Sequence, residues 1–253
     1  MPRKPTTTRL DVGGPDPLYR QVEQRILRCL ADGEWKPGGQ LPTESQLAAR
    51  FGVAVFTIRA GIGELAKSGI LVRKQGKGTF VARHSRSRQR YQFSHIHDAA
   101  GRQLLAGREL VAFARSVATG LEESKLALPA DGRQPVLRLG MRSVDAGETV
   151  ATLDIVLPAR LFGALTAATI RNAKENLYAA YQDACGVNVI RIEERIHGAL
   201  AAADEARILK IRKGAPVLRV ERIAYTYDGL PVEFRTRVFD ATRYHYQTVE
   251  GGV

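Results

Sequence analysis

The feature that most constrains the fold is a basic, glycine-containing turn near residue 76. It lies between two short extended segments, residues 70–73 and 79–82, whose branched and aromatic side chains are typical of strands. Gly76 and Gly78 supply the backbone freedom that a tight hairpin needs. An isolated two-stranded hairpin is unstable in water, so this one must pack against the segments that precede it.

Three short amphipathic helices are predicted before the hairpin. Apolar residues recur at helical spacing over residues 17–31. Thr43 and Gln46 have the spacing of a capping box, which predicts the start of a second helix that Gly52 ends. A third helix is expected over residues 54–67. Three short helices followed by a basic hairpin form a winged helix-turn-helix, a fold that binds DNA.

The distribution of charge agrees with this motif. The chain has 253 residues, with 38 Lys and Arg against 26 Asp and Glu. Residues 1–90 carry 17 basic and 7 acidic side chains, a net charge of +10, whereas the remainder carries only +2. This asymmetry favours a polyanion-binding module joined to a nearly neutral one. Charge alone is weak support, because a basic region can also be an ordinary solvated surface.

From residue 91 onward the pattern changes to extended segments with helical stretches between them. The expected strands are 107–118, 136–144, 149–157, 189–199, 217–227 and 231–239. The expected helices are 121–126, 160–169, 176–185 and 202–209. The mixture predicts an α+β domain with an antiparallel sheet. The expected organisation is a flexible arm (1–16), a winged helix-turn-helix (17–83), a linker (84–94) and an α+β domain (95–248).

Several classes of protein are excluded. No apolar run reaches the roughly 18 residues of a membrane span, and the N-terminus lacks the apolar centre of a secretory signal. Cys29 and Cys185 cannot form a disulfide framework, so a cytoplasmic protein is expected. His95 and His97 lack further ligands in a metal-site pattern. We therefore expect no cofactor, no metal and no catalytic residues.

A winged helix-turn-helix reads bases with the N-terminal part of one helix, and holds phosphates with basic side chains and the wing. Here the third helix would read bases. Val55 and Phe56 would either touch thymine methyl groups or pack against neighbouring protein. The residues expected to contact DNA are Arg50, Val55, Phe56, Thr57, Arg59, Arg73, Lys74, Gln75, Gly76, Lys77 and Gly78.

A series of short segments between Pro17 and Val81 forms a characteristic pattern, which includes Leu41-Pro42-Thr43-Glu44, Phe51-Gly52-Val53, Thr57-Ile58-Arg59 and Gln75-Gly76-Lys77-Gly78-Thr79-Phe80-Val81. With these segments, residues 17–81 resemble the GntR family of bacterial transcription regulators. The chain departs from the family where Ala54-Val55 replaces the usual Ser-Arg or Thr-Arg, and where Ser45 replaces an arginine. Losing the serine cap should cost about 1 kcal/mol. Gly61 and Gly63 should each cost about 1 kcal/mol in helix stability relative to Ala.

The C-terminal part has a second, looser series of landmark segments, such as 136–138, 176–178, 193–196, 215–222 and 228–234. With these segments it resembles the UTRA effector domain of the HutC subfamily, which implies a chorismate-lyase-like α+β fold. It implies an effector pocket on the sheet formed by Arg142, Asn176, Tyr178, Glu233 and Phe239. Arg142 suits an anionic group, because a guanidinium pairs with it bidentately. Alternatively, Arg142 and Glu233 form salt bridges between adjacent strands, and Asn176 caps a helix.

Together these features predict a ligand-responsive bacterial transcription regulator, a repressor that binds a two-fold-related DNA operator as a homodimer. A small, possibly anionic metabolite would bind the C-terminal domain. Two alternatives stay open. One is a non-specific or architectural DNA binder, because two arginines of the recognition region are replaced. The other is a chorismate-lyase-like enzyme with a DNA-tethering domain, although a shared fold does not imply a shared activity.

Overall fold

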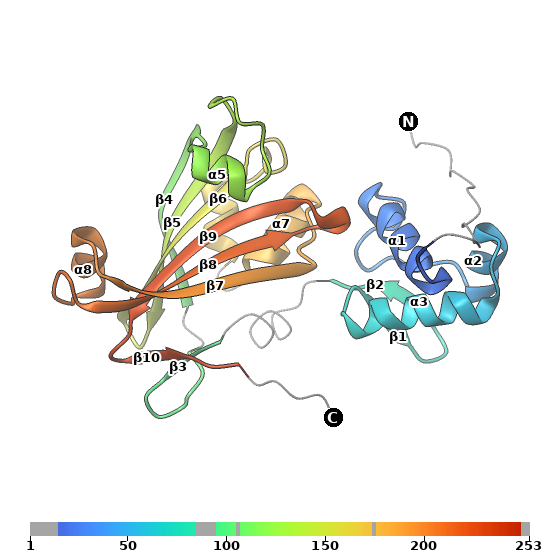
Figure 1. The fold of residues 1–253 in the computed structure, drawn as a ribbon, viewed down its shortest axis with the longest axis horizontal. Helices are drawn as coiled ribbons and strands as arrows, with labels where there is room; N and C mark the ends of the chain where they lie inside the picture. Colours follow the sequence, from blue (N-terminus) through green and yellow to red (C-terminus); the bar gives the residue numbers. More distant parts are fainter. Residues whose placement is uncertain (1–14, 84–94, 105–106, 174–175, 249–253) are drawn as a thin grey trace. The chain divides into compact units, whose positions relative to one another are not determined.

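The computed structural model describes residues 15–83, 95–104, 107–173 and 176–248. The chain divides into two compact units, 1–83 and 84–253, which are described separately (Figure 1). Most of the expected arm and the whole expected linker, residues 84–94, lie outside the described residues. Within the described residues, no helix has the length and apolar character to cross a membrane.

The first unit has the predicted winged helix-turn-helix. Its elements are α1 (Leu18–Ala31), α2 (Glu44–Phe51), α3 (Val55–Lys67), β1 (Leu71–Lys74) and β2 (Gly78–Val81). The two strands pair antiparallel. Apolar side chains from all three helices form the core, and Ile26, Leu47, Ile58 and Ile62 are completely buried. The hairpin joins this core through Leu71, which is also buried.

Local chemistry sets the ends of the helices. The capping box of α2 is confirmed: Thr43 Oγ1 accepts a hydrogen bond from the Gln46 amide, and the Gln46 side chain accepts one from the Thr43 amide. Gly52 ends α2 with a left-handed φ of 71°, which glycine adopts without strain. Ala54, at the start of α3, makes no side-chain capping bond, as the sequence predicted.

The second unit is built on an antiparallel six-stranded sheet in the order β4-β5-β6-β9-β8-β7. Its strands are β4 (Gly107–Val117), β5 (Pro135–Asp145), β6 (Glu148–Pro158), β7 (Arg191–Leu200), β8 (Pro216–Tyr225) and β9 (Pro231–Asp240). Its helices are α5 (Gly120–Lys125), α6 (Ala167–Ala173), α7 (Leu177–Cys185), α8 (Ala203–Leu209) and the 3-10 turn η1 (Tyr227–Gly229). The predicted α+β class is confirmed.

Two details differ from the sequence prediction. The helix expected over residues 160–169 forms later, as α6, because the chain turns after β6 before a helix begins. A two-stranded ribbon, β3 (Ile96–Asp98) paired with β10 (Tyr244–Tyr246), was not predicted. Strands of three residues are too short to show a period-two pattern.

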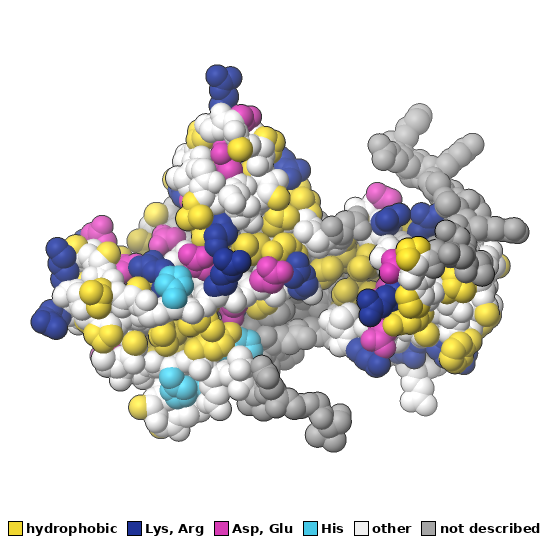
Figure 2. Space-filling model, in the orientation of Figure 1, with side chains coloured by type: hydrophobic (Ala, Val, Ile, Leu, Met, Phe, Trp, Pro, Cys, Tyr) yellow, Lys and Arg dark blue, Asp and Glu magenta, His cyan; other side chains and the backbone are white. Residues whose placement is uncertain are grey.

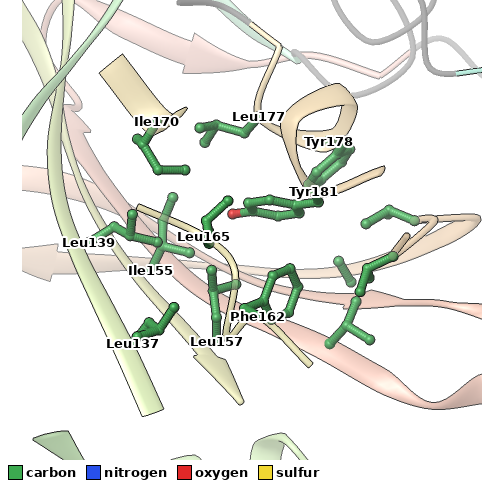
Figure 3. Packing of buried hydrophobic residues seen from close by; sticks show 14 of the residues in the cluster. Leu137, Leu139, Ile155, Leu157, Phe162, Leu165, Ile170, Leu177, Tyr178 and Tyr181 are labelled. Atoms are coloured by element: carbon green, nitrogen blue, oxygen red, sulfur yellow. The ribbon is translucent and has the colours of Figure 1, made fainter. Parts of the chain in front are cut away.

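Both faces of the six-stranded sheet are covered. We call inner the face that carries Leu139, Leu153 and Ala224. Helices α6 and α7 pack on one part of it, where Tyr178 and Tyr181 meet strand residues (Figure 3). A second apolar cluster lies where Ile96 and Tyr244, from the β3–β10 ribbon, pack on the same face. Helices α5 and α8 cover parts of the opposite, outer face.

Candidate DNA-binding and effector-binding sites

The exposed end of α3 presents an unusual combination of side chains. Phe56 is 77% exposed, so the alternative in which it packs against neighbouring protein does not hold within the described part of the first unit. Val55 and Thr57 are half-buried beside it, and the Arg59 side chain is 60% exposed. An exposed aromatic ring next to an exposed guanidinium can contact both a thymine methyl group and a polar base edge.

Glu44 connects three parts of the unit. Its carboxylate lies 2.9 Å from Nε of Arg59 on α3 and 3.6 Å from Nη2 of Arg73 on β1. Arg73 also donates a hydrogen bond to the backbone carbonyl of Arg59, at 3.1 Å. The first residue of α2 therefore orients an arginine of the expected recognition helix and an arginine at the base of the wing.

The wing is short, exposed and held at its base. Lys74, Gln75 and Lys77 are exposed, and Lys74 lies over the ring of Phe80 at 4.7 Å. Lys and Arg side chains are visible on the surface of this unit in Figure 2. Gln40 donates a hydrogen bond to the Lys77 carbonyl at 2.8 Å. Gly78 has a φ of 104°, a backbone conformation that favours glycine, and it lies beside the Gln40 side chain.

Arg50 differs from the other expected DNA contacts. Its guanidinium pairs with Glu34 and lies within 6 Å of the ring centres of Trp35 and Phe51. The ion pair holds the pKa of Glu34 below its usual value. The Arg50 guanidinium therefore has its partners within the unit, where it joins α2 to the segment that connects α1 and α2.

In the second unit the structure separates Arg142 from Glu233. Arg142 lies on the outer face, where it pairs with Glu109 of the neighbouring strand at 2.7 Å. Glu233 lies on the inner face, opposite Ala224. One sheet pocket cannot include both side chains, so the expected pairing of Arg142 with Glu233 in a common pocket is wrong. For Arg142 the structure shows the alternative, a salt bridge between adjacent strands.

The other expected effector residues lie on or beside the inner face. Asn176 caps α7, and its Oδ1 accepts a hydrogen bond from the Ala179 amide at 3.0 Å, so the capping interpretation is confirmed. Tyr178 and Phe239 are completely buried. Phe239 meets the ring of Tyr244 edge-on, at 6.4 Å.

Glu233 is completely buried, and its carboxylate has close partners in the protein. Its oxygens lie 2.8 and 2.9 Å from Nη2 of Arg235. Tyr181 donates a hydrogen bond to it at 2.8 Å and Tyr178 donates another at 3.3 Å. Burial, together with the charge of Glu233, raises the pKa of Tyr181 well above its usual value. Charge-assisted bonds of this kind hold a buried carboxylate in one geometry.

More arginines lie on the same face, and none was assigned a role from the sequence. Arg222, opposite Arg235, pairs with Glu194 at 2.6 Å. Glu194 also accepts a hydrogen bond from Tyr246. Arg237 is two residues beyond Arg235 on β9, and Arg108 approaches from β4. The sequence signal for these arginines is the alternation Glu-Phe-Arg-Thr-Arg-Val over residues 233–238. Such alternation is typical of a strand with one face in water. It indicates buried arginines only when both faces of the sheet are known to be covered.

Comparisons with known proteins agree with both units. Residues 18–81 match the model of bacterial regulatory proteins of the gntR family, and residues 101–245 match the UTRA domain. The chain is 26% identical over 234 residues to the transcriptional repressor NagR of Bacillus subtilis, covering 92% of this chain and 94% of NagR. It is 28% identical over 238 residues to MngR of Escherichia coli, the mannosyl-D-glycerate transport/metabolism system repressor, covering 93% and 97%.

Solved structures give the same result. PhnF from Mycobacterium smegmatis superposes with a TM-score of 0.52 at 25% identity, covering 92% of this chain and all of PhnF. The ligand-binding domain of a GntR-family transcriptional regulator from Bordetella bronchiseptica gives 0.59 at 25% identity, covering 64% and 99%. The chain therefore belongs to the gntR family of bacterial regulatory proteins, and it is a ligand-responsive transcription regulator with a UTRA domain rather than an enzyme.

Proposed function

We propose that this regulator is a repressor that acts in the bacterial cytoplasm and binds a two-fold-related operator as a homodimer. A dimer places two winged units on two half-sites related by the same symmetry. Exposed apolar side chains on the second unit support self-association: Val111 is 66% exposed, Val117 50% and Leu121 59%. The relatives named as repressors support the direction of regulation.

The observation that carries the DNA-binding assignment is the surface around Glu44. It joins the start of α2, the exposed end of α3 and the wing through Arg59 and Arg73. We infer that Arg59 and Phe56 meet bases, with Val55 and Thr57 beside them. The wing residues Arg73 to Gly78 track the phosphates, and Arg50 supports the surface from inside the unit.

Effector binding on the inner sheet face would then change DNA affinity. Tyr178, Glu233 and Phe239 lie on this face, and Asn176 positions α7 above it. An effector alters DNA binding only to the extent that it binds the DNA-competent arrangement more or less tightly than the other. No cofactor is needed for this mechanism.

Arg59→Ala tests the DNA assignment. If Arg59 reads a base, operator affinity should fall by about 5- to 150-fold, equivalent to ~1–3 kcal/mol, as measured by fluorescence anisotropy. Arg160, an exposed arginine of the second unit, provides the matched control: Arg160→Ala should leave affinity unchanged. Equal affinity of the Arg59→Ala and wild-type proteins for the operator would remove Arg59 from the interface.

The second candidate is a DNA binder with little sequence preference. The apolar side chains of Ala54 and Val55 and the pairing of Arg59 with Glu44 favour it, because both reduce the number of polar side-chain groups free to read bases. Titration of operator and scrambled DNA over a range of salt concentrations separates the two. Similar affinities with equally steep salt slopes indicate non-specific binding, whereas a preference for the operator at every salt concentration indicates a specific regulator.

A further inference from the structure

The N-terminal end of α3 is apolar, although it lies in the most basic part of the chain. We call this end the recognition tip, and it consists of Ala54, Val55 and Phe56. Ala54 and Phe56 are exposed, and Val55 is half-buried beside them. At 77%, Phe56 is the most exposed of the large apolar side chains in the described residues. Isolated apolar residues on a surface need no explanation, but three in succession make the first turn of this helix largely apolar.

The polar side chains around the recognition tip are engaged within the winged unit. Nε of Arg59 donates a hydrogen bond to Glu44 at 2.9 Å, and Arg73 donates one to the Arg59 carbonyl at 3.1 Å. Ala54 supplies no capping oxygen at the start of the helix. A hydrogen bond from Nε of Arg59 to a base therefore requires the ion pair with Glu44 to open. An apolar contact of Phe56 requires no such rearrangement.

The surroundings of the tip indicate what it contacts. Residues 1–90 carry a net charge of +10, and the wing presents exposed Lys74 and Lys77, so the partner is DNA. Figure 2 shows apolar side chains beside Lys and Arg on this unit. The edges of the bases in the major groove present hydrogen-bonding groups, with one apolar exception, the C5 methyl group of thymine. Apolar side chains, including phenylalanine, contact this group.

We propose that α3 selects its half-site by the C5 methyl group of a pyrimidine, and that Phe56, with Val55 beside it, detects this group. Thymine supplies the methyl group in unmodified DNA, and 5-methylcytosine supplies it in methylated DNA. An apolar side chain distinguishes a methylated pyrimidine from an unmethylated one, but it does not distinguish O4 of thymine from the amino group of methylcytosine. The regulator therefore responds to cytosine methylation. This inference rests on the proposed function and names the chemical group that the DNA-binding surface recognises.

The test uses the full chain and three pools of random duplex DNA. The first pool contains thymine, the second contains uracil in its place, and the third contains uracil together with 5-methylcytosine in place of cytosine. Selection from the first pool should enrich sequences with a fixed thymine in each half-site. Selection from the third pool should enrich sequences with methylcytosine at that position. The second pool offers no C5 methyl group, so the sequences that it yields should bind more weakly.

Fluorescence anisotropy then measures what the methyl group contributes to affinity. Replacing the fixed thymine of one half-site by uracil should weaken binding about fourfold, which corresponds to ~0.8 kcal/mol for one buried methyl group. Replacing it in both half-sites should weaken binding about 16-fold, because the two positions are far apart and their effects add. At the same position, methylcytosine should bind more tightly than cytosine by the same factor. The two comparisons test the thymine and the methylcytosine sources of the methyl group separately.

Phe56→Ala is the decisive variant. It should bind the thymine and uracil duplexes with nearly equal affinity, because the side chain that detects the methyl group is gone. Phe56→Leu keeps an apolar side chain and should retain the preference for thymine. Leu200→Ala, at a 71% exposed position of β7, is the control and should keep both the affinity and the preference. Thermal unfolding followed by the fluorescence of Trp35, the single tryptophan of the chain, checks that each variant of Phe56 is folded.

The outcomes separate this inference from the proposed function. A preference for thymine over uracil and for methylcytosine over cytosine, lost in Phe56→Ala, supports the inference. An enriched sequence that binds equally well with thymine and with uracil overturns it, and so does a preference that survives in Phe56→Ala. In both of these cases the protein is still a sequence-specific regulator. If no pool yields an enriched sequence while the chain still binds duplex DNA, the proposed specific function fails together with the inference.

Discussion

Arg59 in the winged unit and Arg235 in the UTRA domain both pair with a glutamate, at 2.9 and 2.8 Å, but their surroundings differ. The side chains of Arg59 and Glu44 are 60% and 27% exposed, whereas those of Arg235 and Glu233 are 2% and 0% exposed. Water can replace either partner of the first pair, so Arg59 can leave Glu44 for DNA. It cannot replace a partner of the second pair without opening the core. An exposed ion pair can therefore exchange one partner for another, whereas a buried ion pair keeps its partners while the domain is folded.

The largest expected effect comes from breaking the buried pair. Glu233→Ala should destabilise the UTRA domain by about 3–5 kcal/mol, because Arg235 is left buried without its carboxylate and two tyrosine hydroxyls lose their acceptor. Urea unfolding monitored by circular dichroism measures the change. Glu109→Ala, which breaks the exposed pair with Arg142, should change stability by less than ~1 kcal/mol. Equal effects of the two substitutions would remove the distinction between buried and exposed pairs.

The next effect tests packing in the winged unit. A Cβ on Gly61 would lie 2.7 Å from Val22 Cγ1 and 2.9 Å from the Tyr19 carbonyl, so Gly61 permits α1 and α3 to approach closely. Gly61→Ala should therefore destabilise the unit by about 1–3 kcal/mol, despite the better helix propensity of alanine. Thermal unfolding followed by Trp35 fluorescence measures it. A higher Tm for Gly61→Ala would mean that α1 and α3 can move apart without loss of stability.

The same two units show what sequence reasoning can and cannot reach. The capping box of Thr43 and Gln46 and the stop at Gly52 were predicted, since each depends on residues only a few positions apart. The six strands of the main sheet of the UTRA domain were also predicted, whereas the short β3–β10 ribbon was not. Local signals of this kind need no knowledge of which elements become neighbours.

The site residues of the sheet were harder to predict, because successive side chains of a strand point to opposite faces. Arg142 lies between Met141 and Ser143, which are buried on the inner face, so an error of one position moves a proposed ligand residue across the sheet. The register also shifts between Ser143 and Val144. The arginines of the inner face need long-range information: Arg108, Arg222 and Arg237 come from three strands that only the sheet order places in one sheet.

Gly63 is expected to give a smaller effect of the opposite sign. A Cβ at this position meets nothing within 4 Å, in contrast to Gly61 two residues earlier. Gly63→Ala should stabilise the winged unit by up to ~1 kcal/mol through helix propensity alone. The same Trp35 fluorescence measurement applies. A loss of stability would show that the glycine serves a purpose other than packing, which operator titration of the variant would then identify.

The smallest expected effect concerns Arg142. Because this side chain is 46% exposed on the outer face and paired with Glu109, Arg142→Ala should change stability by less than ~1 kcal/mol. Calorimetry of the full chain measures the change. A loss as large as that expected for Glu233→Ala would show that an exposed pair on the outer face contributes as much as the buried pair on the inner face, and the comparison between the two kinds of pair would fail.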